Sequence, residues 1–460
     1  MVRLFNHWIR LHPLVQMLFD LSFVIVGMLI AFMWVGSGLP INYKQVLLFA
    51  AILAASVVAI NAALGFYQQF HQRDIADGRA RAVLSLYLSV PVAYGIFALL
   101  PMTSVSKEFM QLSAMSAIFG MLVNRVSMSY SASSGTLTKR VMVLGTGSRA
   151  LAVKRALAKS DPSAAIVGFF PSQNEETATV PYDQVLSTGG SLLSTAQMLK
   201  VDEIVVALTE RRGGSMPMRE LLDCKLQGIR VLDLASYFER TLGQIRLDSL
   251  YAGWLIFGDG FRQGPMRRAL KRLSDLIFSV ILLVMALPIM LVTALLIVAE
   301  SGGPIFYRQE RVGREGRLFK VIKFRSMRCD AEKDGRAVWA TANDQRTTKV
   351  GRVIRKLRID ELPQLFCVLK GEMSLVGPRP ERPVFVDQLT REIPFYAVRH
   401  SVKPGLTGWA QVRYHYGATV EDSAEKLQYD LYYVKNNSLF LDIVILFETI
   451  GVVLTGKGAH

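Results

Sequence analysis

Residues 276–299 form a long apolar run that is interrupted at its centre by Pro288. The run is long enough to cross a bilayer, which needs about 20 apolar residues, but a central proline kinks or breaks a helix. Both flanks are basic, so a single crossing would place one of them outside, against the positive-inside rule. We therefore predict a re-entrant hairpin that enters and leaves on the cytoplasmic face, with a proline-kinked span as the alternative. The flanking residues are Arg267, Arg268, Lys271 and Arg272 before the run, and Arg308, Arg311, Arg314 and Arg317 after it.

Four more apolar stretches occupy the first part of the chain, at 14–36, 44–66, 83–101 and 106–128. Each is close to the length of about 20 residues that a membrane-spanning helix needs. Basic residues are concentrated before the first stretch, between the second and the third, and after the fourth. The positive-inside rule therefore predicts four transmembrane helices with both ends of the bundle in the cytoplasm.

The chain carries a net charge of +16, which suits anionic lipid, nucleic acid or phosphorylated substrates. The sequence has neither a zinc-finger spacing nor an RNA-binding aromatic motif, so we predict no nucleic-acid partner. Its three cysteines are far apart and form neither a disulfide framework nor a metal motif. Its six histidines do not cluster, which argues against a histidine-based metal site.

The stretch "KRVMVLGTGSRALAVKRAL" at 139–157 predicts a buried strand, a glycine turn and a helix. Strand and helix signals alternate after it, so we predict a doubly wound α/β domain over about 139–245. Gly145, Gly147 and Ala150 fit a phosphate cradle. However, the second strand ends without the acid that a dinucleotide site needs, and no Tyr-x-x-x-Lys spacing occurs. A degenerate structural or regulatory fold is therefore favoured, with a working nucleotide site as the alternative.

The stretch "LFKVIKFRSM" at 318–327 alternates apolar and basic residues, which is typical of a half-buried strand. In this pattern Lys323 and Arg325 share one face, and Lys320 lies on the other. A strand that presents two cations to one side suits an anionic substrate, so we predict phosphate binding by Lys323 or Arg325. A solvated charged face, or contact with lipid head groups, is the alternative.

Asp360 and Glu361 are adjacent acids just before Pro363, a residue that suits the first turn of a helix. The acids are therefore expected at a helix N-terminus, where a cap and a charge that complements the dipole would be sufficient roles. A helix N-terminus also attracts phosphate, a carboxylate can be a covalent nucleophile, and a second carboxylate can hold a divalent cation. Arg379 lies between two prolines and suits bidentate phosphate binding. Further candidates are Arg352, Arg355 and Arg358.

Several motifs occur in a fixed order: "KRLSD", the proline-broken run, "GxxGxxFxxxKFRSM", "RIDELPQL", "LKGEMSLVGPRPE" and "KPGLTGWAQV". Together they resemble the catalytic core of the bacterial polyprenyl-phosphate glycosyl-1-phosphate transferases, the monotopic phosphoglycosyl transferases, over about 265–460. The preceding spans and Rossmann-like domain resemble the large members that initiate exopolysaccharide or capsule assembly. Those members include the undecaprenyl-phosphate glucose and galactose phosphotransferases.

The resemblance implies a role for each residue of the motifs. Asp360 would attack the β-phosphate of a UDP-sugar and release UMP, and Glu361 would bind Mg²⁺. Undecaprenyl phosphate would then attack the phosphosugar-aspartate. Arg379 and Arg355 would steady phosphates, whereas Lys271, Arg272 and Asp275 would hold the hairpin and meet the lipid phosphate. The chain departs from the family pattern at Leu287, because the hairpin break there often reads Ser-Pro.

We therefore expect a membrane α plus α/β protein of the bacterial inner membrane, with its catalytic domain in the cytoplasm. Its partners would be a UDP-sugar, undecaprenyl phosphate and the bilayer, with homo-oligomerisation left open. The alternatives are a nucleotide-sugar-modifying oxidoreductase and a non-catalytic membrane regulator of polysaccharide export. The identity of the sugar stays open, as does the ligand of the Rossmann-like domain. The expected domains are four transmembrane helices (1–135), the Rossmann-like domain (136–260), the hairpin (261–300) and the catalytic domain (301–460).

Overall fold

The computed structural model describes residues 2–4, 7–9, 11–35, 43–67, 84–85, 87–95, 109, 111–120, 122–123, 139–160, 164–172, 179–186, 190–208, 216–250, 260–261, 263–328, 346–414, 417 and 419–455. The chain forms two compact units. The first contains Trp8–Gly243 and the second contains Gln244–His460, and the short strands β1 (Val2–Leu4) and β2 (His7–Ile9) lie near the N-terminus. The boundaries expected between the four domains stay predictions.

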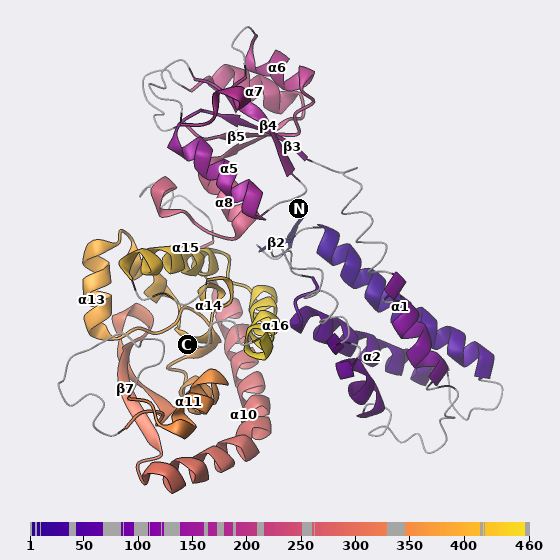
Figure 1. The fold of residues 1–460 in the computed structure, drawn as a ribbon, viewed down its shortest axis with the longest axis vertical. Helices are drawn as coiled ribbons and strands as arrows, with labels where there is room; N and C mark the ends of the chain where they lie inside the picture. The colour runs from indigo at the N-terminus through magenta and orange to yellow at the C-terminus, as the bar shows by residue number, and fades with distance from the viewer. Residues whose placement is uncertain are drawn as a thin grey trace. The chain divides into compact units, whose positions relative to one another are not determined.

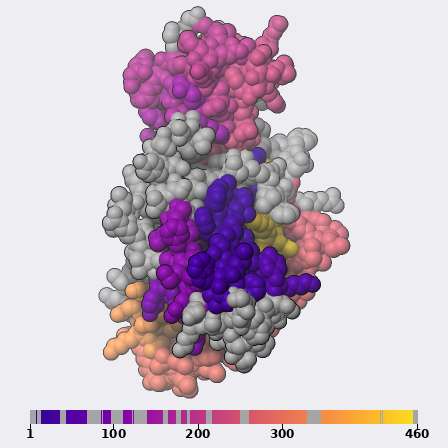
Figure 2. Space-filling model, turned by 90° about the vertical axis from the view of Figure 1, so that its right-hand side faces the viewer, coloured from indigo at the N-terminus to yellow at the C-terminus, as the bar shows by residue number. Residues whose placement is uncertain are grey.

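The N-terminal part of the first unit is helical. Helices α1 (Leu11–Val35) and α2 (Tyr43–Ala63) pack through small and apolar side chains such as Met28 and Ala50, and their outer faces expose apolar residues. Their surface is indigo in Figure 2. Among the described residues, three helices are long and apolar enough to cross a membrane, and α1 and α2 are two of them. The chain is therefore membrane-associated.

The third and fourth predicted spans are described only in part. Residues 87–95 and 111–120 are helical, and Phe109 and Ala117 join the core formed by α1 and α2. Much of both predicted stretches, and the basic loop that precedes the third, lies outside the described residues. The count of four spans therefore stays a prediction.

The rest of the first unit confirms the predicted α/β fold. Its four strands are all parallel and lie in the order β4-β3-β5-β6, which is the crossover pattern of a doubly wound sheet. The elements are β3 (Lys139–Leu144), α5 (Ser148–Ser160), β4 (Ala164–Phe170), η2 (Tyr182–Gln184), α6 (Leu192–Met198), β5 (Glu203–Val206), α7 (Met218–Leu226), β6 (Arg230–Asp233) and α8 (Leu234–Leu242).

Helices cover both faces of this sheet, and the alternation of side chains along β3 explains why. Val141 and Val143 join the core under α5 and α8, whereas Met142 and Leu144 join the core under α6 and α7. Figure 1 shows the two helix pairs on opposite sides of the strands. A strand segment buried on both faces must be continuously apolar, as the last four residues of β3, Val141 to Leu144, are.

The second unit contains two small sheets among helices. Strands β7 (Phe306–Val312) and β8 (Leu318–Phe324) form an antiparallel hairpin, which confirms the strand predicted at 318–327, and β9 (Ser374–Val376) pairs in parallel with β10 (Gly405–Thr407). The helical elements are η3 (Leu247–Ser249), α10 (Pro265–Ser301), η4 (Arg314–Gly316), α11 (Lys349–Lys356), η5 (Ile359–Gln364), α12 (Leu365–Lys370), α13 (Pro383–Glu392), η6 (Tyr396–Ser401), α14 (Trp409–Arg413), α15 (Val420–Asn436) and α16 (Leu439–Thr455).

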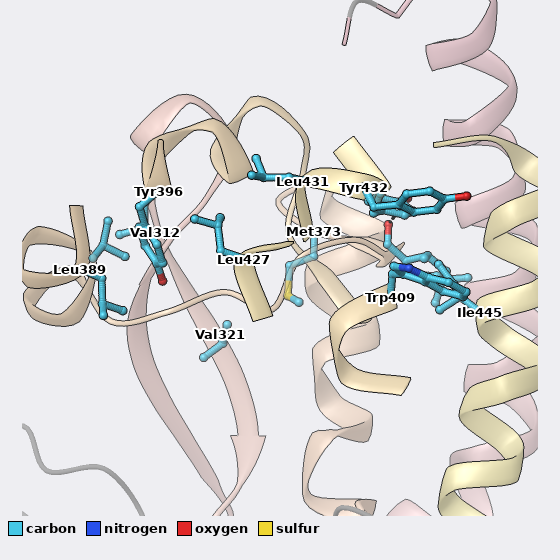
Figure 3. Packing of buried hydrophobic residues seen from close by; sticks show 14 of the residues in the cluster. Val312, Val321, Met373, Leu389, Tyr396, Trp409, Leu427, Leu431, Tyr432 and Ile445 are labelled. Atoms are coloured by element: carbon cyan, nitrogen blue, oxygen red, sulfur yellow. Dashed lines mark hydrogen bonds between the residues drawn. The ribbon is translucent and has the colours of Figure 1, made fainter. Parts of the chain in front are cut away.

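The larger of the two hydrophobic cores described in this unit joins most of its elements. Leu427, Leu431 and Tyr432 of α15 pack with Met373 and with Trp409 of α14, and Trp409 stacks on Tyr432 with ring centroids 5.9 Å apart. Figure 3 shows side chains of this core that come from the hairpin, from Met373 just before β9 and from the helices. Residues far apart in sequence therefore form one rigid support.

Helix α10 contains the proline-broken run and exposes apolar side chains along most of its length. It is the third helix that is long and apolar enough to cross a membrane. Figure 1 shows that it turns along its course, which the missing N–H of Pro288 explains. That the helix re-enters the membrane face that it left stays a prediction.

Candidate active site

The two adjacent acids lie in a tight turn that begins directly after α11. Arg358 adopts a left-handed conformation with φ of 55°, and the chain then forms the 3-10 helix η5, which continues into α12. Asp360 and Glu361 occupy the first turn of η5, and both are buried. The predicted helix N-terminus is therefore present, but it is a 3-10 turn with Pro363 inside it rather than the start of a regular α-helix.

Glu361 is the centre of a cluster of cations. Its Oε1 accepts hydrogen bonds from Arg379 Nη2 at 2.8 Å and from Lys323 Nζ at 3.0 Å, and its Oε2 lies 3.8 Å from Arg358 Nη1. Burial opposes ionisation of this carboxyl, but Arg379 and Lys323 outweigh burial and hold the pKa of Glu361 well below its usual range. The structure therefore brings together four predicted site residues, Glu361 and the three cations around its carboxylate.

Asp360 has a different environment. Among the described residues, no hydrogen bond or ion pair holds its carboxylate, although it is only 8% exposed. Burial, followed by the negative charge of Glu361, raises the pKa of Asp360 to about 6, while Lys323, Arg379 and Arg355 act in the opposite direction. Asp360 is thus an unrestrained carboxylate surrounded by positive charge, which is what a nucleophile directed at phosphorus requires.

The influence of Arg355 on Asp360 depends on the position of α11. Thr348 caps this helix by accepting a hydrogen bond from Gly351 N at 2.9 Å, and Glu300 accepts bonds from the next two free N–H groups, of Lys349 and Val350. Since Arg355 lies in the last turn of α11, these caps position its charge near the acids.

Arg379 lies in the turn that follows β9, where two backbone segments meet closely. A β-carbon on Gly377 would come within 2.4 Å of Lys403 O, and one on Gly405 would come within 2.1 Å of Gly377 N. Gly377 N also donates to Thr407 O at 2.9 Å. The glycines of "VGPRP" and "KPGLTG" therefore allow a contact that fixes the backbone ahead of Arg379.

Sequence reasoning did not identify a second support of Arg379. The buried guanidinium of Arg399 donates from Nη2 to Arg379 O at 3.0 Å and to Asp430 Oδ2 at 2.8 Å, and from Nη1 to the Tyr396 hydroxyl at 2.5 Å. Arg399 thus ties the Arg379 turn to α15. Its signal in the sequence was an arginine shortly before "KPGLTGW", a motif that was used only for its resemblance.

Arg325 is placed differently from the prediction. Strand β8 ends at Phe324, so the alternation that paired Arg325 with Lys323 no longer applies one residue later. Arg325 donates to Ser301 O, Ser301 Oγ and Gly302 O, which are at the C-terminal end of α10. Its guanidinium therefore caps a helix, and phosphate binding by Arg325 stays a prediction.

The basic and acidic residues at the start of α10 hold that helix in place. Lys271 forms an ion pair with Asp442 at 2.8 Å, and Arg272 donates to the last carbonyls of α12. Asp275 accepts bonds from Ser374 Oγ at 3.0 Å and Leu375 N at 3.2 Å. These contacts fix the start of α10, and the predicted roles in holding a hairpin and in meeting a lipid phosphate stay predictions.

The Mg²⁺ predicted at Glu361 stays a prediction, and the acid pair limits which oxygens would hold it. Mg²⁺ is commonly bound by one or two carboxylates together with substrate phosphates and water. Within the described part of the chain, no three His, Cys, Asp or Glu side chains are arranged to hold a metal ion. Glu361 Oε1 already accepts hydrogen bonds from two cations. The oxygens that would bind Mg²⁺ together with a substrate diphosphate are therefore Glu361 Oε2 and those of the Asp360 carboxylate.

The glycine turn of the Rossmann-like domain is formed as predicted. Gly145 has φ of 117°, and its N–H donates to Phe170 O at 2.8 Å. The carbonyl of Thr146 accepts from Thr179 N at 2.9 Å, so the segment at 179–180 lies against the turn. Strand β4 ends at Phe170 without an acid. What this domain binds stays open.

Comparison with known proteins places these features in a family. The family model described as "Bacterial sugar transferase" matches residues 266–456. A "UDP-N-acetylgalactosamine-undecaprenyl-phosphate N-acetylgalactosaminephosphotransferase" of Aeromonas hydrophila is 45% identical over 262 residues, 57% of this chain and 61% of that protein. A "UDP-glucose:undecaprenyl-phosphate glucose-1-phosphate transferase" of Klebsiella pneumoniae is 43% identical over 292 residues, 62% of each chain.

A third relative matches the chain over more of its length. An "Undecaprenyl-phosphate glucose phosphotransferase" of Komagataeibacter xylinus is 33% identical over 430 residues, 88% of this chain and 77% of that protein. The chain therefore spans less than two thirds of the first two relatives, and more than three quarters of the third.

Proposed function

The chain belongs to the family of bacterial sugar transferases, and we propose that it transfers a sugar 1-phosphate from a UDP-sugar to undecaprenyl phosphate through a phosphosugar-aspartate intermediate. The observation that carries this proposal is the unequal environment of the acid pair. Glu361 collects the cations, whereas Asp360 stays unbonded beside them. One relative is named as transferring N-acetylgalactosamine phosphate and another as transferring glucose 1-phosphate. Both sugars are therefore candidates for the sugar that this chain transfers.

In the first step, an Asp360 carboxylate oxygen attacks the β-phosphorus of the UDP-sugar. The bond between this phosphorus and the oxygen that bridges to the α-phosphate breaks, and UMP leaves with that oxygen. Arg379, Lys323 and Arg358 are within reach of Glu361, and they can transfer part of their hydrogen bonding to the phosphate oxygens. Mg²⁺, when bound at Glu361 and the diphosphate, would neutralise phosphate charge.

In the second step, a phosphate oxygen of undecaprenyl phosphate attacks the phosphorus of the acyl phosphate. The bond between phosphorus and Asp360 breaks, and the carboxylate returns to its starting state. The bond between the sugar and its phosphate is kept throughout. Two displacements at one phosphorus explain why one unrestrained carboxylate is sufficient.

Both ends of α10 support the proposed re-entrant topology. A straight helix of its 37 residues would be about 55 Å long. Yet its start is bonded to Asp442 and Ser374, and its end is bonded to Arg325 and the first turn of α11, all in the same compact unit. A helix that turns at Pro288 can meet both anchors and keep the catalytic domain on the cytoplasmic side of the inner membrane.

The test of the reaction is UMP release by the full chain with UDP-glucose or UDP-N-acetylgalactosamine, undecaprenyl phosphate and Mg²⁺. We expect Asp360→Asn to lower the rate by at least about a thousandfold, because a neutral amide is a poor nucleophile. Asp387→Asn, on the exposed face of α13, is the matched control and should keep the wild-type rate.

Each contrary outcome has its own meaning. A wild-type rate in Asp360→Asn would remove the nucleophile assignment. No UMP release by the wild type with either sugar would remove the transferase function, and NAD-dependent turnover without the lipid would favour an oxidoreductase. For the topology, a reporter fused after residue 300 should report cytoplasm, and a periplasmic signal would exclude the hairpin.

A further inference from the structure

His7, in the peptide that precedes α1, is buried in the second unit. It belongs to that unit although it lies at the start of the chain, and it is only 8% exposed. Its ring lies against one aromatic ring from each of three helices, Trp409 of α14, Tyr432 of α15 and Phe440 of α16. We call these four residues the His7 cluster. A side chain so distant in sequence therefore closes a junction between three helices of the catalytic unit.

The cluster combines one hydrogen bond with directional ring packing. His7 Nδ1 and the Tyr432 hydroxyl form a hydrogen bond of 2.8 Å. The His7 ring meets Trp409 at 85° and Tyr432 at 75°, with ring centroids 5.6 Å and 5.8 Å apart. Trp409 and Tyr432 lie next to one another (Figure 3). Edge-to-face contacts place a positive ring edge on a negative ring face, so both the shape and the nitrogen of His7 matter.

The environment of His7 keeps its ring uncharged. Burial lowers the pKa of His7 to about 3, and the positive charge of Arg413 acts in the same direction. Arg413 lies over the Trp409 ring, 4.1 Å from its centroid, and pairs with Glu448 of α16. Protonation near neutral pH therefore does not change the contacts of His7. Its role must follow from what these contacts hold in place.

One partner of His7, Trp409, is joined to the turn that carries Arg379. Gly408 directly precedes Trp409, and a β-carbon on Gly408 would come within 2.1 Å of Gly377 O. Gly377 N also donates to Thr407 O at 2.9 Å. Because these backbones touch, the position of Trp409 on α14 helps to set the position of the residues just ahead of Arg379.

The other hydrogen-bonded partner, Tyr432, is joined to the same turn by a separate route. Asp430 lies two residues before Tyr432 on α15 and forms an ion pair with Arg399 at 2.8 Å. Arg399 also donates to Arg379 O at 3.0 Å. His7 thus links α14 to α15, the two helices whose attached segments hold the Arg379 turn from both sides.

We propose that His7 is a positioning residue for the transfer reaction, which fixes the Arg379 turn by joining α14 to α15. His7 acts through Arg379 and not on the substrate. The peptide before α1 is thereby a working part of the catalytic unit. This inference rests on the proposed function, because it assigns to His7 an effect on that reaction.

The first test is a double-mutant cycle in the full chain, with rates of UMP release divided by the folded fraction from circular dichroism. His7→Ala should lower kcat by about tenfold, because Arg379 is held less well. Arg379→Ala should lower it by about a hundredfold or more. The double variant should match Arg379→Ala within about twofold, because the effect of His7 passes through Arg379. Tyr182→Ala, an aromatic side chain that is 86% exposed, is the control and should keep the wild-type rate.

The second test replaces the missing ring. Imidazole should fit the space that His7→Ala opens, and at pH 8 it is mostly neutral, as His7 is. Added imidazole should raise both Tm and kcat of His7→Ala towards the wild type, and it should leave the wild type and Tyr182→Ala unchanged. His7→Phe keeps a ring but lacks Nδ1, so its Tm should exceed that of His7→Ala and should not respond to imidazole.

The contrary outcomes are distinct. A wild-type kcat in His7→Ala would overturn the positioning role. A double variant about tenfold slower than Arg379→Ala would overturn it too, because additive effects mean that His7 acts elsewhere. A Tm of His7→Ala that ignores imidazole would overturn the cluster as the site of the ring. Absence of UMP release by the wild type would remove the proposed function and the positioning role with it, while the Tm measurement would still report whether the ring occupies the cluster.

Discussion

The Rossmann-like domain and the catalytic unit each contain a buried glutamate surrounded by three cations. In the former, Glu203 on β5 lies 3.0 Å from Lys139, 3.0 Å from Arg240 and 3.9 Å from Arg230. In the latter, Glu361 has contacts of 2.8 Å, 3.0 Å and 3.8 Å with its own three cations. By distance alone the two clusters are nearly interchangeable.

The surroundings distinguish them. The side chain of Arg240 is 5% exposed, and Glu203 belongs to a regular strand, so this cluster braces the sheet. The side chain of Arg379 is 37% exposed. Glu361 also lies next to Asp360, whose carboxylate has no hydrogen bond or ion pair among the described residues. The cluster around Glu361 has cations that solvent can reach and a second acid beside it, so it can bind a ligand. The cluster around Glu203 is buried in the domain core, so it stabilises the fold.

The largest expected effects are a loss of activity on substitution of Glu361 and a loss of stability on substitution of Glu203. Glu361→Gln should lower kcat/KM for UMP release by about a hundredfold or more, because the cations lose the carboxylate that arranges them. Its cost in stability should be the smaller of the two, since its cations are partly solvated. Glu203→Gln should lower the free energy of unfolding by about 3–5 kcal/mol, because Arg240 is left buried without its partner.

The measurement combines thermal unfolding with UMP release per folded molecule. Glu203→Gln should keep the wild-type rate once its folded fraction is counted. A large loss of that rate in Glu203→Gln, or a wild-type rate in Glu361→Gln, would break the distinction between support and site.

Arg399 should have a smaller effect on the reaction, through Arg379. Arg399→Lys removes the fork that bonds Arg379 O, Asp430 and the Tyr396 hydroxyl together, so we expect kcat to fall by about ten- to a hundredfold. The fall should persist per folded molecule, as counted by the initial burst of UMP. Arg391→Lys on the exposed face of α13 is the control, and equal kcat in the two variants would reject the positioning role.

The dependence on pH tests the environment of Asp360. Its pKa is raised to about 6, and the nucleophile must be ionised, so kcat/KM should be level above that pH and fall about tenfold per unit below it. Burial also raises the pKa of Asp430 to about 6, so Asp430→Asn is the required control. If Asp360 governs the profile, this variant keeps its shape. A profile that stays level to pH 5 would contradict the raised pKa.

The smallest expected effects come from removing the side-chain caps of two helices, one in each unit. Ser191 caps α6 in the Rossmann-like domain and Thr348 caps α11 in the catalytic unit, each by accepting from a backbone N–H. Either change to Ala should cost about 1 kcal/mol of stability. Only Thr348→Ala should also lower the rate, by a few fold, because α11 carries Arg355. Equal rates in the two variants would mean that the position of α11 is not limiting.

Local patterns predicted several elements correctly. The apolar strand and glycine turn at 139–157, the half-buried strand β8 and the acid pair in the first turn of a helical element all follow from short-range periodicity and turn chemistry. Arg358 and Arg379 were identified because they lie near the acids in recognisable motifs, and Lys323 was identified from the alternation of apolar and basic residues along its strand. The structure places all three around Glu361.

What the sequence left unresolved depends on contacts between distant segments. Arg399 meets Asp430 of α15, and Glu203 meets Arg240 of α8, and no local period marks such pairs. The placement of Arg325 apart from Lys323 has a simple cause, because β8 ends at Phe324 and alternation does not show where a strand ends.

The most direct test of the account is a reaction without the acceptor. The full chain is mixed with UDP-glucose or UDP-N-acetylgalactosamine and Mg²⁺, and the released UMP and the mass of the peptide that contains Asp360 are measured. We predict one UMP released per active site, a sugar-phosphate mass on Asp360, and its loss on addition of undecaprenyl phosphate. UMP release that requires the acceptor, with no added mass on Asp360, would contradict the covalent mechanism.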